Sequence, residues 1–86
     1  MAQVEVYTKA FCPYCTRAKM LLESKGADFQ EIDVTMDRAG FDAMVGRANG
    51  RRTVPQIFIG GKHVGGSDDL AALEAKGELD ALLGAA

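Results

Sequence analysis

The alternation of apolar and polar residues predicts regular structure in the first half of the chain. Val4 and Val6 alternate with polar neighbours, which is typical of a short strand with one buried face. Pro13 suits the first turn of a helix, where its missing N–H costs nothing, and Gly26 is a favourable helix stop. Residues 28–34 are expected to form a second strand, although their apolar positions do not alternate cleanly.

The middle of the chain predicts a helix followed by a hairpin. Asp37 can cap a helix that ends at Asn49-Gly50, and its apolar stripe consists of Phe41, Met44, Val45 and Ala48. The runs 56–59 and 62–65 are separated by Gly60-Gly61, which is typical of a β-hairpin with a two-residue turn.

The last part of the chain predicts helical structure that opens at Gly66-Ser67-Asp68-Asp69. Ser67 is the expected N-cap, and the two aspartates favour the positive end of the helix dipole. Gly77 should break this region, and three leucines after it, Leu79, Leu82 and Leu83, indicate a final short helix.

The element order β-α-β-α-β-β-α predicts an α/β fold, with a four-stranded mixed β-sheet flanked by helices. The first βαβ unit should be parallel and right-handed, and the terminal hairpin antiparallel. A chain of 86 residues with 48% hydrophobic residues is expected to form one domain spanning residues 1–86.

Composition and charge exclude some classes of partner. The net charge of -2 comes from 12 acidic and 10 basic residues of scattered sign, which gives no general attraction to nucleic acid or membranes. The first residues do not resemble a signal peptide, and no apolar run is long enough to span a bilayer. A cytoplasmic protein is the expectation, and there a Cys-x-x-Cys pair is more often redox-active or metal-binding than a structural disulfide.

The run Cys12-Pro13-Tyr14-Cys15 carries the chemistry that the sequence indicates. Pro13 places Cys12 at the start of the helix, where free N–H groups and the helix dipole stabilise a thiolate, and Lys9 lies three residues earlier. Cys15 lies one turn inside the helix and should be less acidic. We therefore predict that Cys12 is the nucleophile and that Cys15 resolves the mixed disulfide.

A Cys-x-x-Cys pair has two other possible uses. A zinc site needs about four ligands, whereas this chain offers two cysteines and His63, so no metal is expected. A metal shared between two chains, or an iron–sulfur cluster, stays open. An inert pair is disfavoured, because the βαβ context matches the redox interpretation.

Three motifs in this order resemble a dithiol glutaredoxin of the short bacterial type. They are Cys12-Pro13-Tyr14-Cys15 after a strand, Thr53-Val54-Pro55 before another, and Gly65-Gly66-Ser67-Asp68-Asp69-Leu70 at a helix start. The likeness covers nearly the whole chain. It implies a thioredoxin fold, a cis peptide bond before Pro55 and a monomer. It also implies glutathione as electron donor and reduction of protein–glutathione mixed disulfides or protein disulfides, with ribonucleotide reductase as one candidate substrate.

The resemblance also implies a glutathione-binding set: Lys9, Tyr14, Arg52, Thr53, Val54, Pro55, Gly66, Ser67 and Asp68. The exposed backbone of Val54 would pair with the cysteinyl part as an added strand does. The N–H groups of Ser67 and Asp68 would bind the γ-glutamyl carboxylate, and the Asp68 carboxylate would bind the ammonium. Lys9 and Arg52 would attract the glycyl carboxylate, and Tyr14 would pack on the tripeptide.

Each of these roles has a simpler alternative. Ser67 and Asp68 are good helix-capping residues whatever they bind, Arg52 can be a solvated loop residue, and Tyr14 can simply cover the disulfide. Relatives of the short type often carry a cysteine at the position of Ser67. A serine at this position should leave the local backbone N–H donors in place, and glutathione binding with them. It cannot carry out the redox chemistry of a third thiol.

Two other functions remain as alternatives to a glutathione-dependent enzyme. One is a redoxin reduced by a flavoprotein reductase. The other is an iron–sulfur carrier in which two chains and two glutathiones hold a cluster through Cys12. Pro13 counts against the carrier, since the relatives best known for that role lack this proline.

Overall fold

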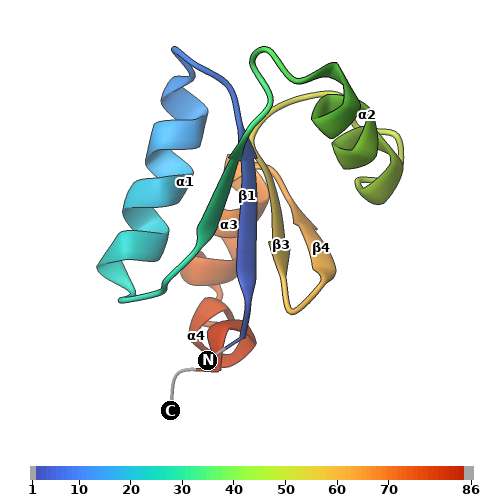
Figure 1. Ribbon diagram of the computed structural model, residues 1–86. Helices are drawn as coiled ribbons and strands as arrows, with labels where there is room; N and C mark the ends of the chain where they lie inside the picture. The colour runs from blue at the N-terminus through green and yellow to red at the C-terminus, as the bar shows by residue number, and fades with distance from the viewer. Residues whose placement is uncertain (1, 85–86) are drawn as a thin grey trace.

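The computed structural model describes residues 2–84, and Figure 1 shows how their elements are arranged. The elements in chain order are β1 (Val4–Thr8), α1 (Pro13–Ser24), β2 (Gln30–Asp33), α2 (Arg38–Arg47), β3 (Gln56–Ile59), β4 (Lys62–Gly65), α3 (Ser67–Ala75) and α4 (Leu79–Leu83). This order confirms the predicted β-α-β-α-β-β-α arrangement, with α4 as the short helix expected after Gly77.

The four strands form one mixed sheet in the order β2-β1-β3-β4. β2 runs parallel to β1, whereas β3 is antiparallel to β1 and β4 is antiparallel to β3. Both predicted relations, the parallel βαβ unit and the antiparallel hairpin, are therefore confirmed. Because β1 lies inside the sheet, the loop that follows it starts from a fixed strand end and leads to Cys12, and Cys15 lies in the first turn of α1.

Helices cover both faces of this sheet, because successive side chains of a strand point to opposite faces (Figure 1). On one face, Val4 and Val6 of β1 pack with buried residues of α1, α3 and α4. On the other face, Tyr7 of β1 and Phe58 of β3 pack with Met44 of α2. The sheet is thus packed between two apolar clusters, which fix the position of β1 and of the strand end from which the next loop starts.

Proline, glycine and helix-capping residues determine most element boundaries, as predicted. α1 begins at Pro13, and Gly26 after its end has a positive φ of 68°. The hairpin turns at Gly60 and Gly61, whose φ angles of 60° and 79° are those a tight two-residue turn needs. Asp37 caps α2, its carboxylate accepting the Gly40 N–H at 2.9 Å.

The second strand is shorter than predicted. β2 covers Gln30–Asp33 rather than residues 28–34, because the Ala27 N–H still bonds back to the Leu22 carbonyl and the chain straightens only afterwards. β2 is also an edge strand that pairs with β1 alone, and its side chains are mostly exposed. This position explains why its apolar residues do not alternate cleanly.

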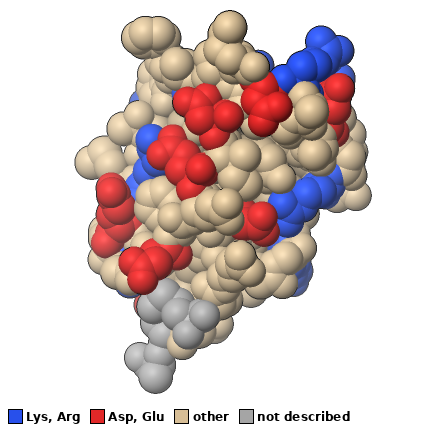
Figure 2. Space-filling model, in the orientation of Figure 1, with Lys and Arg blue, Asp and Glu red and all other residues tan. Residues whose placement is uncertain are grey.

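The surface face in Figure 2 carries side chains of both charge signs and no continuous basic area. In residues 2–84, none of the helices has the length and apolar character needed to cross a membrane.

Candidate active site

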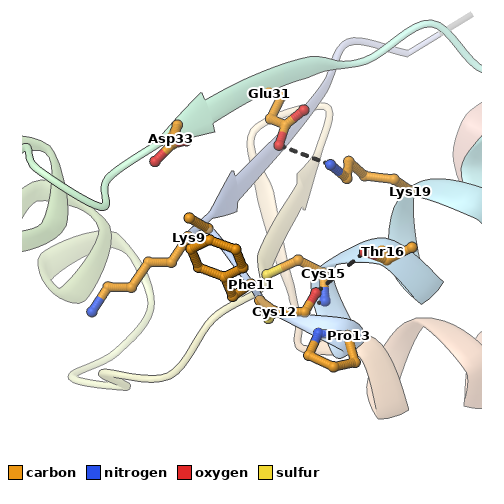
Figure 3. Close-up of a pocket in the computed structure, with 10 residues that line it drawn as sticks. Lys9, Phe11, Cys12, Pro13, Cys15, Thr16, Lys19, Glu31 and Asp33 are labelled. Carbon is orange, nitrogen blue, oxygen red and sulfur yellow. Dashed lines mark hydrogen bonds and ion pairs between the residues drawn. The ribbon is translucent and has the colours of Figure 1, made fainter.

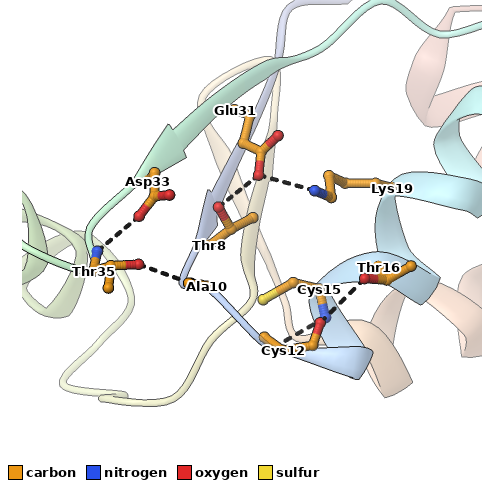
Figure 4. A network of polar contacts seen from close by, with 9 residues as sticks. All are labelled: Thr8, Ala10, Cys12, Cys15, Thr16, Lys19, Glu31, Asp33 and Thr35. Carbon is orange, nitrogen blue, oxygen red and sulfur yellow. Dashed lines mark hydrogen bonds and ion pairs between the residues drawn. The ribbon is translucent and has the colours of Figure 1, made fainter.

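Cys12 forms the N-cap of α1, with an extended backbone at φ -114° and ψ 101°. Its sulfur accepts the backbone N–H of Cys15 at 3.2 Å, in the place where a serine or aspartate oxygen usually caps a helix (Figure 4). The sulfur therefore lies at the positive end of the helix dipole with an N–H donor directed at it. These are the features that stabilise negative charge on a sulfur atom.

The two cysteines are free and occupy different environments. Cys12 is half-buried, whereas Cys15 is only 2% exposed. Burial raises the pKa of the Cys15 thiol to about 12, the hydrogen bond with Cys12 acts in the same direction, and a backbone N–H of Lys9 opposes both. The accessible thiol at the helix start is thus Cys12, as predicted.

The peptide bond between Val54 and Pro55 is cis, which confirms what the resemblance implied. This segment lies beside the cysteines, although it is far from them in sequence. The Cys12 thiol donates to the Val54 carbonyl at an S···O distance of 3.8 Å. Pro55 is buried, while Thr53 is exposed and Val54 half-buried, so that the chain just before the proline faces solvent.

A groove of about 240 Å³ begins at this segment and ends at the N-terminus of α3. Its lining residues are Tyr14, Arg51, Thr53, Val54, Pro55, Gly66, Ser67, Asp68 and Asp69. Seven of the nine residues predicted to bind glutathione are in this set, and only Lys9 and Arg52 are not. The fold therefore brings the second and third sequence motifs to one continuous surface next to Cys12.

The predicted N-cap of α3 is wrong. The N-cap is Gly66, and Ser67 is the first residue of the helix, so its hydroxyl does not cap. The Asp69 carboxylate does this instead, accepting the Gly66 N–H at 2.8 Å and an Arg51 N–H at 3.0 Å. These hydrogen bonds, first that of Gly66, lower the pKa of Asp69. The N–H groups of Ser67 and Asp68 have no partner within the helix and remain available to an anion.

Arg51 and Asp69 are groove residues that the sequence interpretation missed. The sequence interpretation gives Arg51 no role in binding and treats Asp69 only as a charge at the helix dipole. The spacing of Asp69 three residues after Gly66 was the available signal, because it is that of a capping box. Gly65, at φ 122°, must be glycine here, since a Cβ would collide with the Asp69 carboxylate.

Lys9 and Arg52 meet over the ring of Phe41 in α2. The Lys9 Nζ is 4.5 Å and the Arg52 Cζ is 5.2 Å from the ring centroid. Figure 3 shows the Lys9 side chain pointing away from the cysteines, toward α2. These two cations, which the sequence interpretation assigned to one carboxylate, therefore gather in one place adjoining the active-site loop.

A second hollow, of about 570 Å³, opens on the cysteine loop (Figure 3). It is lined by Lys9, Ala10, Phe11, Cys12, Pro13, Cys15, Thr16, Lys19, Glu31 and Asp33, and it shares no lining residue with the groove. On its wall the Glu31 carboxylate accepts the Thr8 hydroxyl at 2.8 Å and the Lys19 ammonium at 3.0 Å (Figure 4). The sequence interpretation gave this hollow no role.

A buried amide supports the groove from below. Gln56 is fully buried, and its Nε2 donates to the Thr53 carbonyl at 3.0 Å and to the Thr53 hydroxyl at 3.2 Å. Its Oε1 then accepts the Nε2–H of His63 at 2.7 Å, which fixes the tautomer of that ring. Burial lowers the pKa of His63, so the ring is neutral at pH 7. This chain of bonds orients Thr53, next to Val54.

Gln56→Leu is expected to lower the free energy of unfolding by about 1–3 kcal/mol, because the Thr53 carbonyl and the His63 N–H would lose their buried partner. Urea unfolding followed by circular dichroism measures the change. Lys62→Ala, at an exposed position of the same hairpin, is the matched control and should stay within about 0.5 kcal/mol of the parent chain. Equal stability of all three proteins would show that the Gln56 amide is not needed.

Within residues 2–84, no group of three or more His, Cys, Asp or Glu side chains gathers as a metal ion would require. The chemistry that the site offers on its own is that of two unequal thiols beside an extended segment and a helix N-terminus.

Comparison with known proteins gives a consistent result. The family model described as Glutaredoxin matches residues 4–64. The chain is 58% identical over 83 residues to Glutaredoxin 3 of Escherichia coli K12, which covers 96% of this chain and 99% of that protein. The solution structure of glutaredoxin from Brucella melitensis superposes on this chain with a TM-score of 0.86. The two sequences are 54% identical, and the match covers 99% of this chain and 91% of the Brucella chain. The crystal structure of the buckwheat glutaredoxin–glutathione complex also superposes with a TM-score of 0.86. Its sequence is 35% identical, and the match covers 96% of this chain and 77% of the buckwheat chain.

The mixed sheet, its flanking helices and the free Cys-x-x-Cys pair at a helix start define a thiol–disulfide oxidoreductase of the thioredoxin fold. Within that class, the chain belongs to the glutaredoxin family.

Proposed function

We propose that this enzyme depends on glutathione and reduces protein–glutathione mixed disulfides and protein disulfides, with Cys12 as the nucleophile and Cys15 as the resolving thiol. One observation carries the proposal. The Cys12 sulfur lies 3.8 Å from the Val54 carbonyl, beside a groove that leads to the N-terminus of α3. A thiol next to an extended backbone and an anion-binding helix end matches the parts of glutathione in order.

In this proposal the groove binds glutathione through its backbone. The Val54 segment pairs with the cysteinyl residue, and the N–H groups of Ser67 and Asp68 bind the γ-glutamyl carboxylate. The exposed Asp68 carboxylate binds the γ-glutamyl ammonium. The buckwheat glutaredoxin of similar fold forms a complex with glutathione, which supports this assignment.

The remaining proposed contacts come from Tyr14 in the groove and from Lys9 and Arg52 outside it. Lys9 and Arg52, which meet over Phe41, attract the glycyl carboxylate. Tyr14 is 53% exposed and lines the groove, so its ring can pack on the tripeptide. Thr53, Pro55 and Gly66 contribute surface and backbone.

The reaction then runs in two thiol–disulfide exchanges. The Cys12 thiolate attacks the glutathione sulfur of a mixed disulfide; the new Cys12–glutathione bond forms as the old S–S bond breaks, and the protein sulfur leaves as a thiolate that takes up a proton. A second glutathione thiolate attacks the bound glutathione sulfur, releases Cys12 as a thiolate and leaves as glutathione disulfide.

For a protein disulfide, Cys12 bonds to one protein sulfur and releases the other. The Cys15 thiol then loses its proton and attacks Cys12, which releases the reduced protein and closes the Cys12–Cys15 disulfide. Two glutathiones reopen that bond and leave as glutathione disulfide. The proposed partners are thus glutathione and oxidised proteins, with ribonucleotide reductase as one candidate. The proposed form of the enzyme is a monomer in the cytoplasm.

A donor comparison tests the proposal. The oxidised protein is mixed with glutathione and glutathione reductase, or separately with a flavoprotein thioredoxin reductase, and NADPH consumption is followed with a glutathionylated protein as substrate. Turnover with glutathione and little with the flavoprotein alone is the expected result. Turnover with the flavoprotein alone would show that the flavoprotein, and not glutathione, is the electron donor. A coloured protein that absorbs visible light after anaerobic purification would favour the iron–sulfur carrier.

Asp68→Asn should raise the KM for a glutathionylated peptide about tenfold, because it removes a charge-assisted hydrogen bond to the γ-glutamyl ammonium while keeping the shape of the side chain. Steady-state kinetics with the same coupled assay measure the change, and kcat should move less than KM. Asp42→Asn is the matched control, since Asp42 lies on α2 and pairs with Arg38. An unchanged KM in Asp68→Asn would remove Asp68 from the binding set.

A further inference from the structure

Phe11 is the most exposed large apolar residue described, at 103% of its reference surface. It directly precedes Cys12, and its backbone adopts a φ of 56°. Left-handed backbone is uncommon for a residue with a Cβ and most unusual for a bulky one. The chain therefore holds a phenyl ring in solvent, on an unfavourable backbone, beside its nucleophile.

Within residues 2–84, the ring is not buried against any other side chain. A phenyl side chain stabilises a fold by leaving water, and Phe11 does not leave it. The loop conformation does not need it either, since asparagine or glycine adopts left-handed backbone more readily. The ring is therefore free to contact a molecule that binds beside Cys12.

The position of Phe11 indicates what that something is. Phe11 lines the hollow of about 570 Å³ that also contains Cys12 and Cys15, and it does not line the groove proposed for glutathione (Figure 3). The charged groups of this hollow have other contacts: Lys19 pairs with Glu31 at 3.0 Å, and Asp33 accepts the Thr35 N–H at 2.8 Å. Lys9 also lines the hollow, but its side chain points away from the cysteines, with its Nζ 4.5 Å from the centroid of the Phe41 ring (Figure 3). The exposed apolar group at the edge of this hollow is therefore the ring of Phe11.

We propose that Phe11 and this hollow dock the protein substrate, and that they favour substrates with an apolar side chain next to the reacting cysteine. Phe11 directly precedes Cys12, so in this proposal a protein whose sulfur bonds to Cys12 brings a residue next to that sulfur into contact with the Phe11 ring. Glutathione is small, and all its proposed contacts lie on the groove and at Lys9 and Arg52. The inference rests on the proposed function in taking Cys12 as the atom that bonds to the substrate.

The test uses disulfide-bonded peptides that differ only in the residue next to the cysteine, leucine or serine. The parent protein should have about a fivefold higher kcat/KM for the leucine peptide, as expected for partial burial of one apolar side chain. In Phe11→Asn this preference should fall to about one, while turnover of the cysteine–glutathione mixed disulfide stays the same. Asparagine tolerates the left-handed backbone, so the variant should fold at least as stably as the parent.

Met36→Asn is the matched control, because Met36 is 95% exposed and lies outside the hollow. It should keep the leucine preference. A preference that survives in Phe11→Asn would overturn the inference, and so would an equal loss of turnover with cysteine–glutathione. Sedimentation that shows a dimer dissociated by Phe11→Asn would also overturn it, since a second copy would then cover the ring.

The two proposals fail in different ways. With dithiothreitol as reductant, the peptide preference is measured without glutathione. Loss of the preference in Phe11→Asn under these conditions supports docking at Phe11 even if glutathione proves to be the wrong donor. The same preference in both proteins refutes docking even if glutathione is the right one.

Discussion

Cys12→Ser should abolish thiol–disulfide exchange, with a loss on the order of a thousandfold or more for every disulfide substrate. The hydroxyl cannot form the mixed disulfide through which both proposed routes pass. Cys15 cannot take over, because it is 2% exposed and burial raises the pKa of its thiol to about 12. The coupled glutathione assay measures the loss, first with a glutathionylated peptide and then with a protein disulfide.

The fold of this variant should remain intact, which makes the result easy to interpret. Serine is a good N-cap, so its oxygen can accept the Cys15 N–H that the Cys12 sulfur accepts now. Thermal unfolding should therefore give a Tm close to that of the parent chain. Comparable residual activity in Cys12→Ser and Cys15→Ser would contradict the assignment of a single nucleophile.

Local signals explain why most of the fold could be predicted from the sequence. Pro13 fixed the start of α1, Gly60-Gly61 fixed the hairpin, and the Asp37 side chain fixed the start of α2. Each of these acts within a few residues, through a fixed φ, a positive φ or a short side-chain hydrogen bond. The resemblance to glutaredoxins, rather than any local signal, implied that Val54-Pro55 and the start of α3 lie at one site with Cys12.

The features that the sequence did not reveal depend on hydrogen bonds and backbone angles that form only in the folded chain. Asp69 rather than Ser67 caps α3, because Arg51 and the Gly66 N–H converge on its carboxylate. The hydrogen bond between Gln56 of β3 and His63 of β4 requires these two strands to pair first. The exposure of Phe11 follows from the left-handed backbone before Cys12, for which the residue type gives no warning.

Cys15→Ser should separate the two activities that the proposal joins. Reduction of a protein–glutathione mixed disulfide needs Cys12 and a second glutathione, so its rate should stay within about twofold of the parent chain. Reduction of a protein disulfide needs an internal attack on the bond to Cys12, so its rate should fall about tenfold or more. Parallel assays on one glutathionylated protein and one disulfide-bonded protein measure the difference, and an equal fall in both would show that Cys15 serves the site in another way.

In the parent chain, the pH dependence of the attack of Cys15 on the mixed disulfide at Cys12 gives an independent check on the role of Cys15. Burial is the largest cause of the raised pKa of Cys15, and it persists when Cys12 is bonded to a substrate and no longer carries charge. Well below that pKa the thiolate fraction rises about tenfold per pH unit, so closure of the Cys12–Cys15 disulfide should accelerate steadily between about pH 6 and pH 8.5. Single-turnover release of a peptide from its mixed disulfide with Cys12 measures this step. In Cys15→Ser the accelerating phase should vanish, whereas a pH-independent closure in the parent chain would mean that another group takes the Cys15 proton beforehand.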